Sequence, residues 1–479
     1  MIWILYALLA LLIVFLAVIL TRACLFKPKA SAPVDAEEIS VDNDRAVDHL
    51  AQMIRVKTVS HRDNSLVDWE RFSEFRALLR ELYPAITSAC TIEEIGKSGV
   101  LYHLKGTSDA NPSVFMAHYD VVPVNEDAWT KPPFDAVIEN GVLWGRGALD
   151  TKITLLGVME AAEDLLNRGF TPQNDMYFAF SGDEEIMGDS APAIVAELER
   201  RGVKPGIVVD EGGAVVEGVF PGVSSPCALV GTGEKGLMDL DFSIKAGGGH
   251  ASSPPPHTSI GKLASAVTRM ENKPFPAFLT KPAAEMFDTL GRHSTFAYRI
   301  IFANLWCFFP VLNSMCKKQG GEMNALLRTT CAFTMMSGSQ AHNVLPPYAM
   351  VGANLRLNNH DTLSGALAYL KSVAADEDIE LNMVYGMEAS IASDTHCESW
   401  DKLSSAIAST WKGSIVSPYL MVACSDSRHY CRICDKVYRF SAMALSSEER
   451  RLIHGNDERI PVEKIGKTVE FYRRLLAQF

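Results

Sequence analysis

Apolar strands alternate with helical segments over most of the chain. In residues 45–232, the runs SVFMAHYD (113–120), DMYFAFSGDEE (175–185) and GIVVDEGG (206–213) are short, apolar and polar at or near their ends, and ITLLGVMEAAEDLLNRG (153–169) has a helical period. Strands that alternate with helices indicate an α/β fold with a mixed, mostly parallel sheet. Ligands of such sheets bind beyond the carboxyl ends of the strands, so the acids found there are expected to converge.

A second module covers residues 233–388, where the pattern predicts elements in the order β-α-β-β-α-β. This is the order of a ferredoxin-like α+β sandwich, whose helices cover one face of a sheet. An insertion at 274–328 contains the apolar run FAYRIIFANLWCFFPVL (296–312). We expect a helical hairpin packed on the module, because apolar helical segments usually belong to a core. A wall for an apolar substrate is the alternative, while Arg299 and Asn304 disfavour a second membrane span.

The N-terminus begins with an uninterrupted apolar run, Ile2–Leu20, which is close to the length that crosses a bilayer as a helix. No Lys or Arg precedes this run and basic residues follow it from Arg22 onward. A retained single-pass transmembrane anchor over residues 1–21 is therefore favoured over a cleaved signal peptide. Residues 22–44 mix Pro, Ala and acids without periodicity and are predicted to form a linker. The positive-inside rule favours the cytoplasm for the rest of the chain.

Length and composition fit this organisation. A chain of 479 residues exceeds the size of one hydrophobic core. We therefore expect one domain made of residues 45–232 and 389–479, with the module inserted into it. The net charge of -12 argues against nucleic acid as a partner. The only tight cysteine pair, Cys431 and Cys434, has no second pair or matching histidines for a structural zinc site, so ordinary thiols are favoured.

Histidines and acids stand at the polar ends of the strands and in glycine-flanked turns. These residues are His118, Asp120, Asp150, Glu184, Glu185, Asp210 and His454. Taken alone, Asp150 could cap a helix and a single histidine could belong to the core. Taken together, imidazoles and carboxylates are suitable zinc ligands, and three protein ligands per ion leave a position for water. A two-metal hydrolase site accounts for the whole set.

The same residues carry a resemblance to a known family. His118-Tyr119-Asp120, Asp150-Thr151-Lys152, Glu184-Glu185, Asp210 and His454 match, in order, the H-x-D, D-[TM]-K, E-E, D and late H motifs. The sequence resembles the di-zinc metallopeptidase family of aminoacylase, glutamate carboxypeptidase and succinyl-diaminopimelate desuccinylase. Within it, GRGALDTK, SGDEE, SDSRHY and IHGNDE are most similar to the branch of Gly-X carboxypeptidase and N-fatty-acyl-amino-acid synthase/hydrolase.

The resemblance implies a role for each of these positions. Asp150 would bridge two Zn²⁺ ions, for which Co²⁺ or Mn²⁺ could substitute. His118 and Asp210 would complete one ion, and Glu185 and His454 the other. Asp120 would hold the imidazole of His118. Glu184 would be the general base that takes a proton from water and returns it to the departing amine.

The inserted module would serve as a lid and dimerisation domain. By resemblance, His250 in AGGGHASSP would stabilise the developing oxyanion, often across a homodimer, while Asn343 and Arg356 would hold the substrate. Arg356 could pair with a carboxylate through its planar fork, although a surface strand arginine is the alternative. Asp426 and Arg428 match an S/T-D-x-R motif and would also belong to the substrate-binding residues, although the motif does not define the separate role of each. Cys424 and its neighbours replace the Gly-Gly-Thr-like stretch of many members, so fine specificity does not transfer.

The expected function is cleavage of an amide bond next to a free carboxylate. Carboxypeptidase action on short peptides and hydrolysis of N-acyl amino acids are the same reaction with different acyl groups, and the reverse reaction would be synthesis. A dipeptidase or aminopeptidase-like member is the alternative, and a catalytically inactive membrane-bound binding protein is less favoured because every core position is present. The relatives in this branch act in a vacuole or outside the cell, so the side of the membrane stays open.

Overall fold

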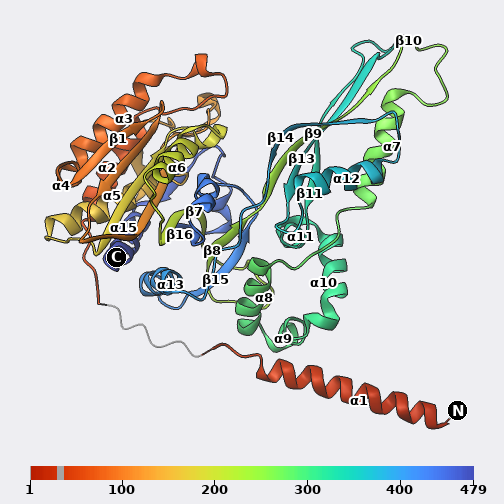
Figure 1. Ribbon diagram of the computed structural model, residues 1–479, viewed down its shortest axis with the longest axis horizontal. Helices are drawn as coiled ribbons and strands as arrows, with labels where there is room; N and C mark the ends of the chain where they lie inside the picture. The colour runs from red at the N-terminus through yellow and green to blue at the C-terminus, as the bar shows by residue number, and fades with distance from the viewer. Residues whose placement is uncertain (1, 30–36) are drawn as a thin grey trace.

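The computed structural model describes residues 2–29 and 37–479 (Figure 1). The apolar N-terminal run forms helix α1 (Ile2–Leu25). Within the described residues, α1 is the one continuous helix whose length and composition suit a membrane span. The predicted linker, 22–44, lies partly outside the described residues, and the chain re-enters the large domain at α2 (Asn43–Arg55).

The large domain contains an eight-stranded mixed sheet in the order β1-β2-β6-β3-β7-β16-β8-β15. The pairs β6–β3, β3–β7, β7–β16 and β8–β15 are parallel, and the outer pairs β1–β2 and β2–β6 are antiparallel. The strand bounds are Cys90–Ile95 (β1), Gly99–Leu104 (β2), Ser108–His118 (β3), Asn174–Ser181 (β6), Ile207–Val216 (β7), Cys227–Glu234 (β8), Ile415–Met421 (β15) and Val437–Leu445 (β16). The sheet is thus mixed and largely parallel in its centre, as predicted.

Helices cover both faces of this sheet because its central strands are apolar on both sides. Along β3, Phe115 packs in one hydrophobic cluster, whereas Val114 and Met116 pack in another on the opposite face. The first cluster also receives buried residues of α2, α3 (Trp69–Leu82), α4 (Pro84–Ala89), α5 (Lys152–Asn167), α13 (Glu398–Thr410) and α15 (Val462–Leu476). The second receives α6 (Ser190–Arg200) and the 3-10 helix η4 (Asp426–Arg432).

The module has the predicted order of elements. Its four strands, β9 (Gly236–Lys245), β11 (Thr330–Ser337), β13 (Tyr348–Leu357) and β14 (Glu380–Met387), form an antiparallel sheet in the order β11-β13-β9-β14. Helices α7 (Ser259–Asn272) and α12 (Leu363–Ala374) pack on it in a separate hydrophobic core. A two-stranded extension, β10 (Gly249–His250) with β12 (Val344–Leu345), projects at the far end from the large domain (Figure 1).

The insertion differs from the expected hairpin on the module. It forms four helices: α8 (Lys281–His293), α9 (Phe296–Phe302), α10 (Leu305–Gln319) and α11 (Gly321–Leu327). Most of its buried apolar residues, including Met286, Phe287 and Leu290 of α8, belong to the hydrophobic core of the large domain, while Phe275 packs in the core of the module. Helix α8 lies against the edge strand β15, so the apolar face of the insertion packs on the large sheet. The module has a separate hydrophobic core.

The remaining elements are short. They are the three-stranded sheet of β4 (Val137–Glu139), β5 (Val142–Trp144) and β17 (Arg459–Pro461), helix α14 (Ser447–Arg450), and the 3-10 helices η1 (Asn64–Leu66), η2 (Glu126–Ala128) and η3 (Glu184–Ile186). The pairing of β5 with β17 brings the GRGALD turn next to the segment that carries His454. All ten cysteines are free thiols.

Candidate active site

The candidate site lies at the carboxyl ends of three neighbouring parallel strands. His118 ends β3 and pairs in register with Ser181, which ends β6. The Glu184-Glu185 turn, η3, follows Ser181 directly, and Asp210 lies on β7, the other neighbour of β3. Parallel strands bring their carboxyl ends to one edge, which is why residues distant in sequence meet here.

Asp150 lies between the two histidines. Its Oδ1 is 3.1 Å from Nε2 of His118, and its Oδ2 is 3.0 Å from Nε2 of His454. On the His454 side, Oε2 of Glu185 lies 3.0 Å from the same Nε2. On the His118 side, Oε1 of Glu211 lies 3.1 Å from Nε2 of His118. Two groups of imidazole and carboxylate therefore share the Asp150 carboxylate.

Glu211, rather than Asp210, completes the group around His118. The carboxylate of Asp210 accepts a hydrogen bond of 3.0 Å from the backbone N–H of Ser427 instead. Strand β7 bulges here, because Asp210 pairs with Arg439 whereas the next β16 residue, Phe440, pairs with Gly213. The two extra residues leave the ladder, and Gly212 adopts φ 145° where a Cβ would stand 2.7 Å from the Cβ of Arg439.

This bulge sets which of the two adjacent acids lies beside Nε2 of His118. Asp210 and Glu211 are adjacent in the sequence, and the family motif assigns the metal ligand to Asp210. With the bulge, the carboxylate of Glu211 lies 3.1 Å from Nε2 of His118, while that of Asp210 bonds to Ser427. The conspicuous Gly-Gly after Glu211 was the available signal of an irregular strand.

Asp120 holds the two elements of the site together. Its Oδ1 lies 3.2 Å from Nδ1 of His118, on the side of the ring opposite Nε2. The same carboxylate accepts backbone hydrogen bonds from Glu184 (3.1 Å) and Glu185 (3.2 Å). Asp120 thus fixes both the imidazole orientation and the start of η3. Asp183 shapes the other side of this turn by accepting from the backbone N–H groups of Asp189 and Ser190.

A buried carboxylate, Glu458, holds the turn that presents Asp150. Its Oε1 accepts from the backbone N–H groups of Leu149 (2.6 Å) and Asp150 (3.1 Å), and its Oε2 accepts from Gly147 (3.0 Å). Nη1 of Arg146 donates to Oε2 at 2.6 Å. The Glu458 side chain is inaccessible to solvent, so all its compensation for lost hydration comes from these bonds.

The electrostatics of the site reflect crowded acids. Burial raises the pKa of Glu184 well above its ordinary value, and the nearby acids Asp426, Glu211 and Glu185 add to the rise. Burial likewise raises the pKa of Glu211 to about 8. Burial also acts on Asp150, but hydrogen bonds from His118 and His454 outweigh it and lower the pKa of Asp150. Carboxylates gathered at this density require positive charge beside them.

The donor set fits metal ions. Ligand atoms of His118, Asp150 and Glu185 all lie within 4.8 Å of one another, and so do those of His118, Glu184 and Glu211. Imidazole nitrogen and carboxylate oxygen are ligands that zinc and similar divalent metals accept. Divalent cations placed between these groups would supply the missing positive charge.

Asp426 and Arg428 lie next to this cluster, and Arg356 contacts the segment just before them. Oδ2 of Asp426 accepts a hydrogen bond of 2.5 Å from Ser181, and burial raises the pKa of Asp426 to about 7. Nη1 of Arg428 is buried and has no hydrogen-bond partner within the described residues. From the module, Nη1 of Arg356 donates to the sulfur of Cys424 at 3.2 Å, two residues before Asp426.

His250 and Asn343 lie apart from the cluster in this chain. Both are solvent-exposed on the β10–β12 extension, at the end of the module farthest from the large domain (Figure 1). Nδ1 of His250 accepts a hydrogen bond from the backbone N–H of Ser252, and the carbonyl oxygen of Asn343 accepts from Ala251. The fold thus brings the two residues to each other but not to Asp150.

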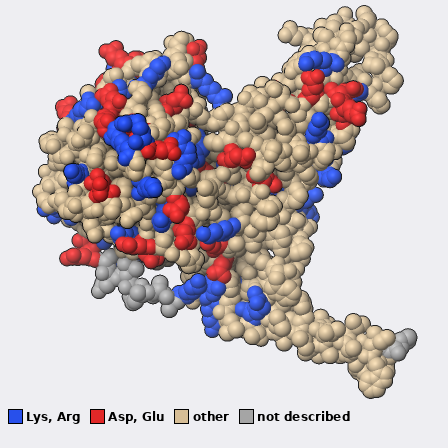
Figure 2. Space-filling model, in the orientation of Figure 1, with Lys and Arg blue, Asp and Glu red and all other residues tan. Residues whose placement is uncertain are grey.

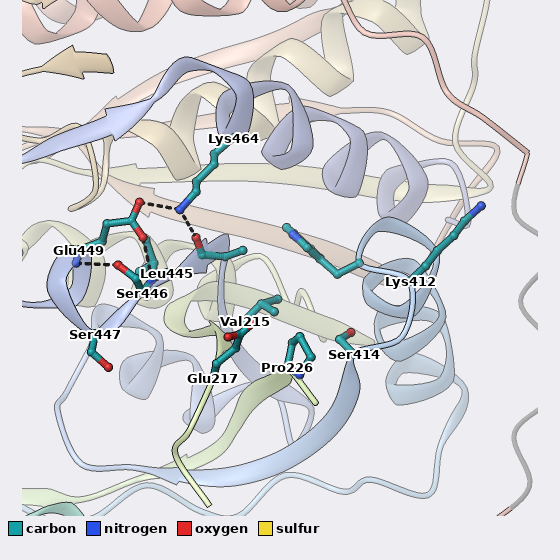
Figure 3. A pocket seen from close by; sticks show the side chains of 12 residues that line it. Val215, Glu217, Pro226, Lys412, Ser414, Leu445, Ser446, Ser447, Glu449 and Lys464 are labelled. Atoms are coloured by element: carbon teal, nitrogen blue, oxygen red, sulfur yellow. Dashed lines mark hydrogen bonds and ion pairs between the residues drawn. The ribbon is translucent and has the colours of Figure 1, made fainter. Parts of the chain in front are cut away.

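A cavity of about 490 Å³ lies elsewhere, at the ends of β7 and β16 (Figure 3). Lys464, which lines it, donates to the carboxylate of Glu449 and to the carbonyl oxygen of Ala444. None of the residues of the metal cluster lines this cavity. Since the partly buried Lys464 is already paired within the chain, the cavity does not compete with the cluster as the functional site.

Comparison with known proteins agrees with this geometry. A family model described as Peptidase family M20/M25/M40 matches residues 114–478. The chain belongs to this family. The M20 chain is 35% identical over 477 residues to an N-fatty-acyl-amino acid synthase/hydrolase PM20D1 of Xenopus tropicalis, covering 97% of this chain and 93% of the relative. It is 32% identical to a carboxypeptidase S-like protein of Dictyostelium discoideum, covering 89% and 83% of the two chains.

Solved structures show the same M20 fold. The metallo-carboxypeptidase Sso-CP2 of Sulfolobus solfataricus superposes with a TM-score of 0.65 at 15% identity, covering 90% of this chain and 98% of that one. Human carnosine dipeptidase 1 gives 0.60 at 15% identity, with coverage of 91% and 97%. The predicted family and its hydrolase class are confirmed, and the inactive binding protein is not favoured.

Proposed function

We propose that this M20 enzyme uses two zinc ions to hydrolyse an amide bond whose amine side carries a free carboxylate, with N-acyl amino acids as substrates. The observation that carries the proposal is the pair of imidazole–carboxylate groups that share Asp150. The similarity to N-fatty-acyl-amino acid synthase/hydrolases over nearly the whole chain supports the acyl substrate.

Each ion would have three protein ligands. Asp150, His118 and Glu211 would hold one, and Asp150, His454 and Glu185 the other, with Glu211 in place of the predicted Asp210. Three ligands per ion leave room for water and substrate. Asp210 would support this arrangement indirectly, because its bond to Ser427 fixes the start of η4 beside the site.

When bound, the two ions polarise the amide carbonyl and make a water molecule acidic enough to react near neutral pH. Glu184 would accept the proton of this water and then deliver it to the amine nitrogen as the C–N bond breaks. Asp120 would keep Glu184 in place, since it bonds to the backbone at the start of η3. The reverse sequence of proton transfers would give synthesis from a free acid and an amino acid.

The inserted module would complete the site as a lid. Arg356 is already at the rim through its contact with Cys424, and its planar fork suits the substrate carboxylate. The imidazole of His250 would stabilise the carbonyl oxygen as it becomes negative, with Asn343 beside it. Their distance from the cluster favours delivery by the module of a partner subunit in a homodimer.

We further propose that α1 is a retained single-pass membrane anchor. All its residues from Ile2 to Leu20 are apolar, and most are exposed. A helix of about 20 apolar residues spans the hydrocarbon layer of a bilayer.

A carboxypeptidase acting on short peptides is the second candidate. The similarity to carboxypeptidase S-like 2 of Dictyostelium discoideum and the shared fold with Sso-CP2 favour it. The catalytic groups would act in the same way, and only the acyl side of the substrate would differ.

The test compares substrates with and without metal. Purified full-length enzyme should hydrolyse long-chain N-acyl amino acids, lose activity with a chelator and regain it with Zn²⁺. Methyl esters of the same substrates should react poorly, since Arg356 then lacks an anion to bind. Activity that survives chelation would overturn the zinc mechanism, and turnover confined to short peptides would select the carboxypeptidase.

A further inference from the structure

The C-terminal end of α1 packs against α9 of the insertion 274–328 (Figure 1). The Arg22 guanidinium donates from Nε (3.1 Å) and Nη2 (2.9 Å) to the carbonyl oxygen of Ala303, at the end of α9. In return, the side-chain amide of the fully buried Asn304 donates to the carbonyl oxygen of Ile19 at 3.0 Å. The inner side of α1, with Ile19 and Ala23, is buried by this contact.

Large apolar side chains remain exposed on α9 and α10 beside this junction. They are Phe296 (42% exposed), Tyr298 (39%), Trp306 (62%), Val311 (50%) and Met315 (55%). The surface along α1 and α10 is largely free of charged side chains in Figure 2. A continuous exposed surface of this kind marks a site of contact with a membrane or another protein.

The position of Trp306 relative to α1 decides between these two. Its ring packs edge-on against Phe15 of α1, with centroids 6.1 Å apart. Phe15 lies inside the apolar run, five residues before its end at Leu20, which is about 7–8 Å along a helix. Apolar faces of membrane-surface helices enter a bilayer by about 5–10 Å. If α1 spans the bilayer, Trp306 is therefore at the depth that such a helix reaches.

The insertion is suited to lie in the surface layer and not to cross it. Helix α10 has 15 residues and contains Pro310, so it reaches only about 22 Å, less than the roughly 30 Å hydrocarbon layer. Helices α9 and α10 meet at a bend of 105°. Lys317 and Lys318 lie in the last turn of α10. Arg292 lies 4.5 Å from the ring centroid of Phe26, just after the C-terminal end of α1. Such cations suit the lipid headgroups.

We infer that α9 and α10 form a second membrane contact, which lies in the interfacial layer of the bilayer that α1 spans. The partner is the lipid bilayer itself. The inference rests on the proposed anchor. Because α8 of the same insertion packs on β15, the large domain would then be held against the membrane at a fixed orientation and not on a free tether.

The experiment uses fluorescence quenching by brominated lipid. The full-length Trp3→Phe variant, which removes the tryptophan of α1, is reconstituted in phosphatidylcholine vesicles with and without bromine on the acyl chains. Bromine should quench part of the fluorescence, and adding Trp306→Phe should remove most of that quenching. The matched control, Trp129→Phe on the same background, replaces a partly buried tryptophan of the large domain and should leave the quenching unchanged.

The two outcomes that would contradict the inference are distinguishable. Hydrolytic activity of each variant shows that it is folded, because Trp306 touches none of the site residues. Equal quenching with and without Trp306, in protein that floats with the vesicles, would overturn the second contact and leave the anchor. Failure of the full-length protein to float with vesicles would overturn the anchor and the contact together.

Discussion

The site residues of the large domain bond to one another and, apart from the exposed His454, are buried or partly buried, whereas those on the module extension are exposed and bonded only to their neighbours. His118 is 2% exposed and meets Asp120, Asp150 and Glu211. His250 is exposed and its only side-chain bonds within the described residues are to Ser252. One half of the proposed site is thus assembled within a single chain, and the other half is not.

This difference separates two tasks. Binding metal and placing the general base demand fixed geometry, which buried hydrogen-bonded carboxylates provide. The oxyanion forms only after the substrate has bound, so the group that stabilises it can arrive when the site closes, and an exposed imidazole on a projecting extension can do so. A substitution in the first half should therefore impair the site of its own chain, whereas a substitution in the second half should impair the site of the partner chain.

The largest effects are expected at the two adjacent glutamates. Glu184→Gln should lower kcat by about 10²- to 10⁴-fold because the general base is lost, while the zinc content stays at the wild-type value. Glu185→Gln should lose zinc, because it removes a carboxylate that lies 3.0 Å from His454. Metal analysis and kinetics of both proteins measure this. The exposed Glu217→Gln is the control, and equal zinc loss in Glu184→Gln and Glu185→Gln would refute the division of roles.

The next effect tests the exposed half. His250→Ala should lower kcat by about 10²- to 10³-fold, the usual loss for an oxyanion donor. Mixing equal amounts of the His250→Ala and Glu184→Gln subunits should restore about a quarter of the wild-type activity, because half of the dimers are mixed and each has one complete site.

The mixture is informative in either direction. If His250 served its own chain through closure of the module, each site of a mixed dimer would lack one group and no activity would return. A mixture of Glu184→Gln with Glu185→Gln is the matched control, since both substitutions lie on the same half. No recovery is expected in that control, and recovery there would show that mixing restores activity without delivery of His250 by a partner, which would refute the shared site.

The sequence predicted the assembled half better than the rest. Apolar strands ending in His118 and Glu184-Glu185 could be recognised because parallel strands share an edge. The position of Glu211 beside His118 could not be predicted, because it depends on a bulge that forms against β16, far away in sequence. The packing of the insertion on the large domain could not be predicted either, because a local apolar pattern does not reveal which sheet a helix covers. The separation of His250 from the metal cluster likewise depends on the length of the β10–β12 extension, which the hydrophobic pattern of the sequence does not reveal.

The smallest effect concerns the buried support of Asp150. Glu458→Gln replaces one acceptor oxygen with an N–H₂ group, so one set of backbone N–H donors around the turn loses its partner. The turn should then hold Asp150 less well, and zinc affinity should fall about tenfold, at the low end for residues that orient metal ligands.

This variant distinguishes positioning from catalysis. At saturating Zn²⁺, kcat of Glu458→Gln should approach the wild-type value, because no group that touches substrate has changed. Zinc titration of activity measures both quantities, with the exposed Glu448→Gln as the control. A low kcat that zinc does not restore would mean that Glu458 acts on the reaction itself. Unchanged zinc affinity would mean that the histidines and Glu185 hold Asp150 without help from Glu458. The half of the site assembled within one chain would then depend less on buried hydrogen bonds than the geometry indicates.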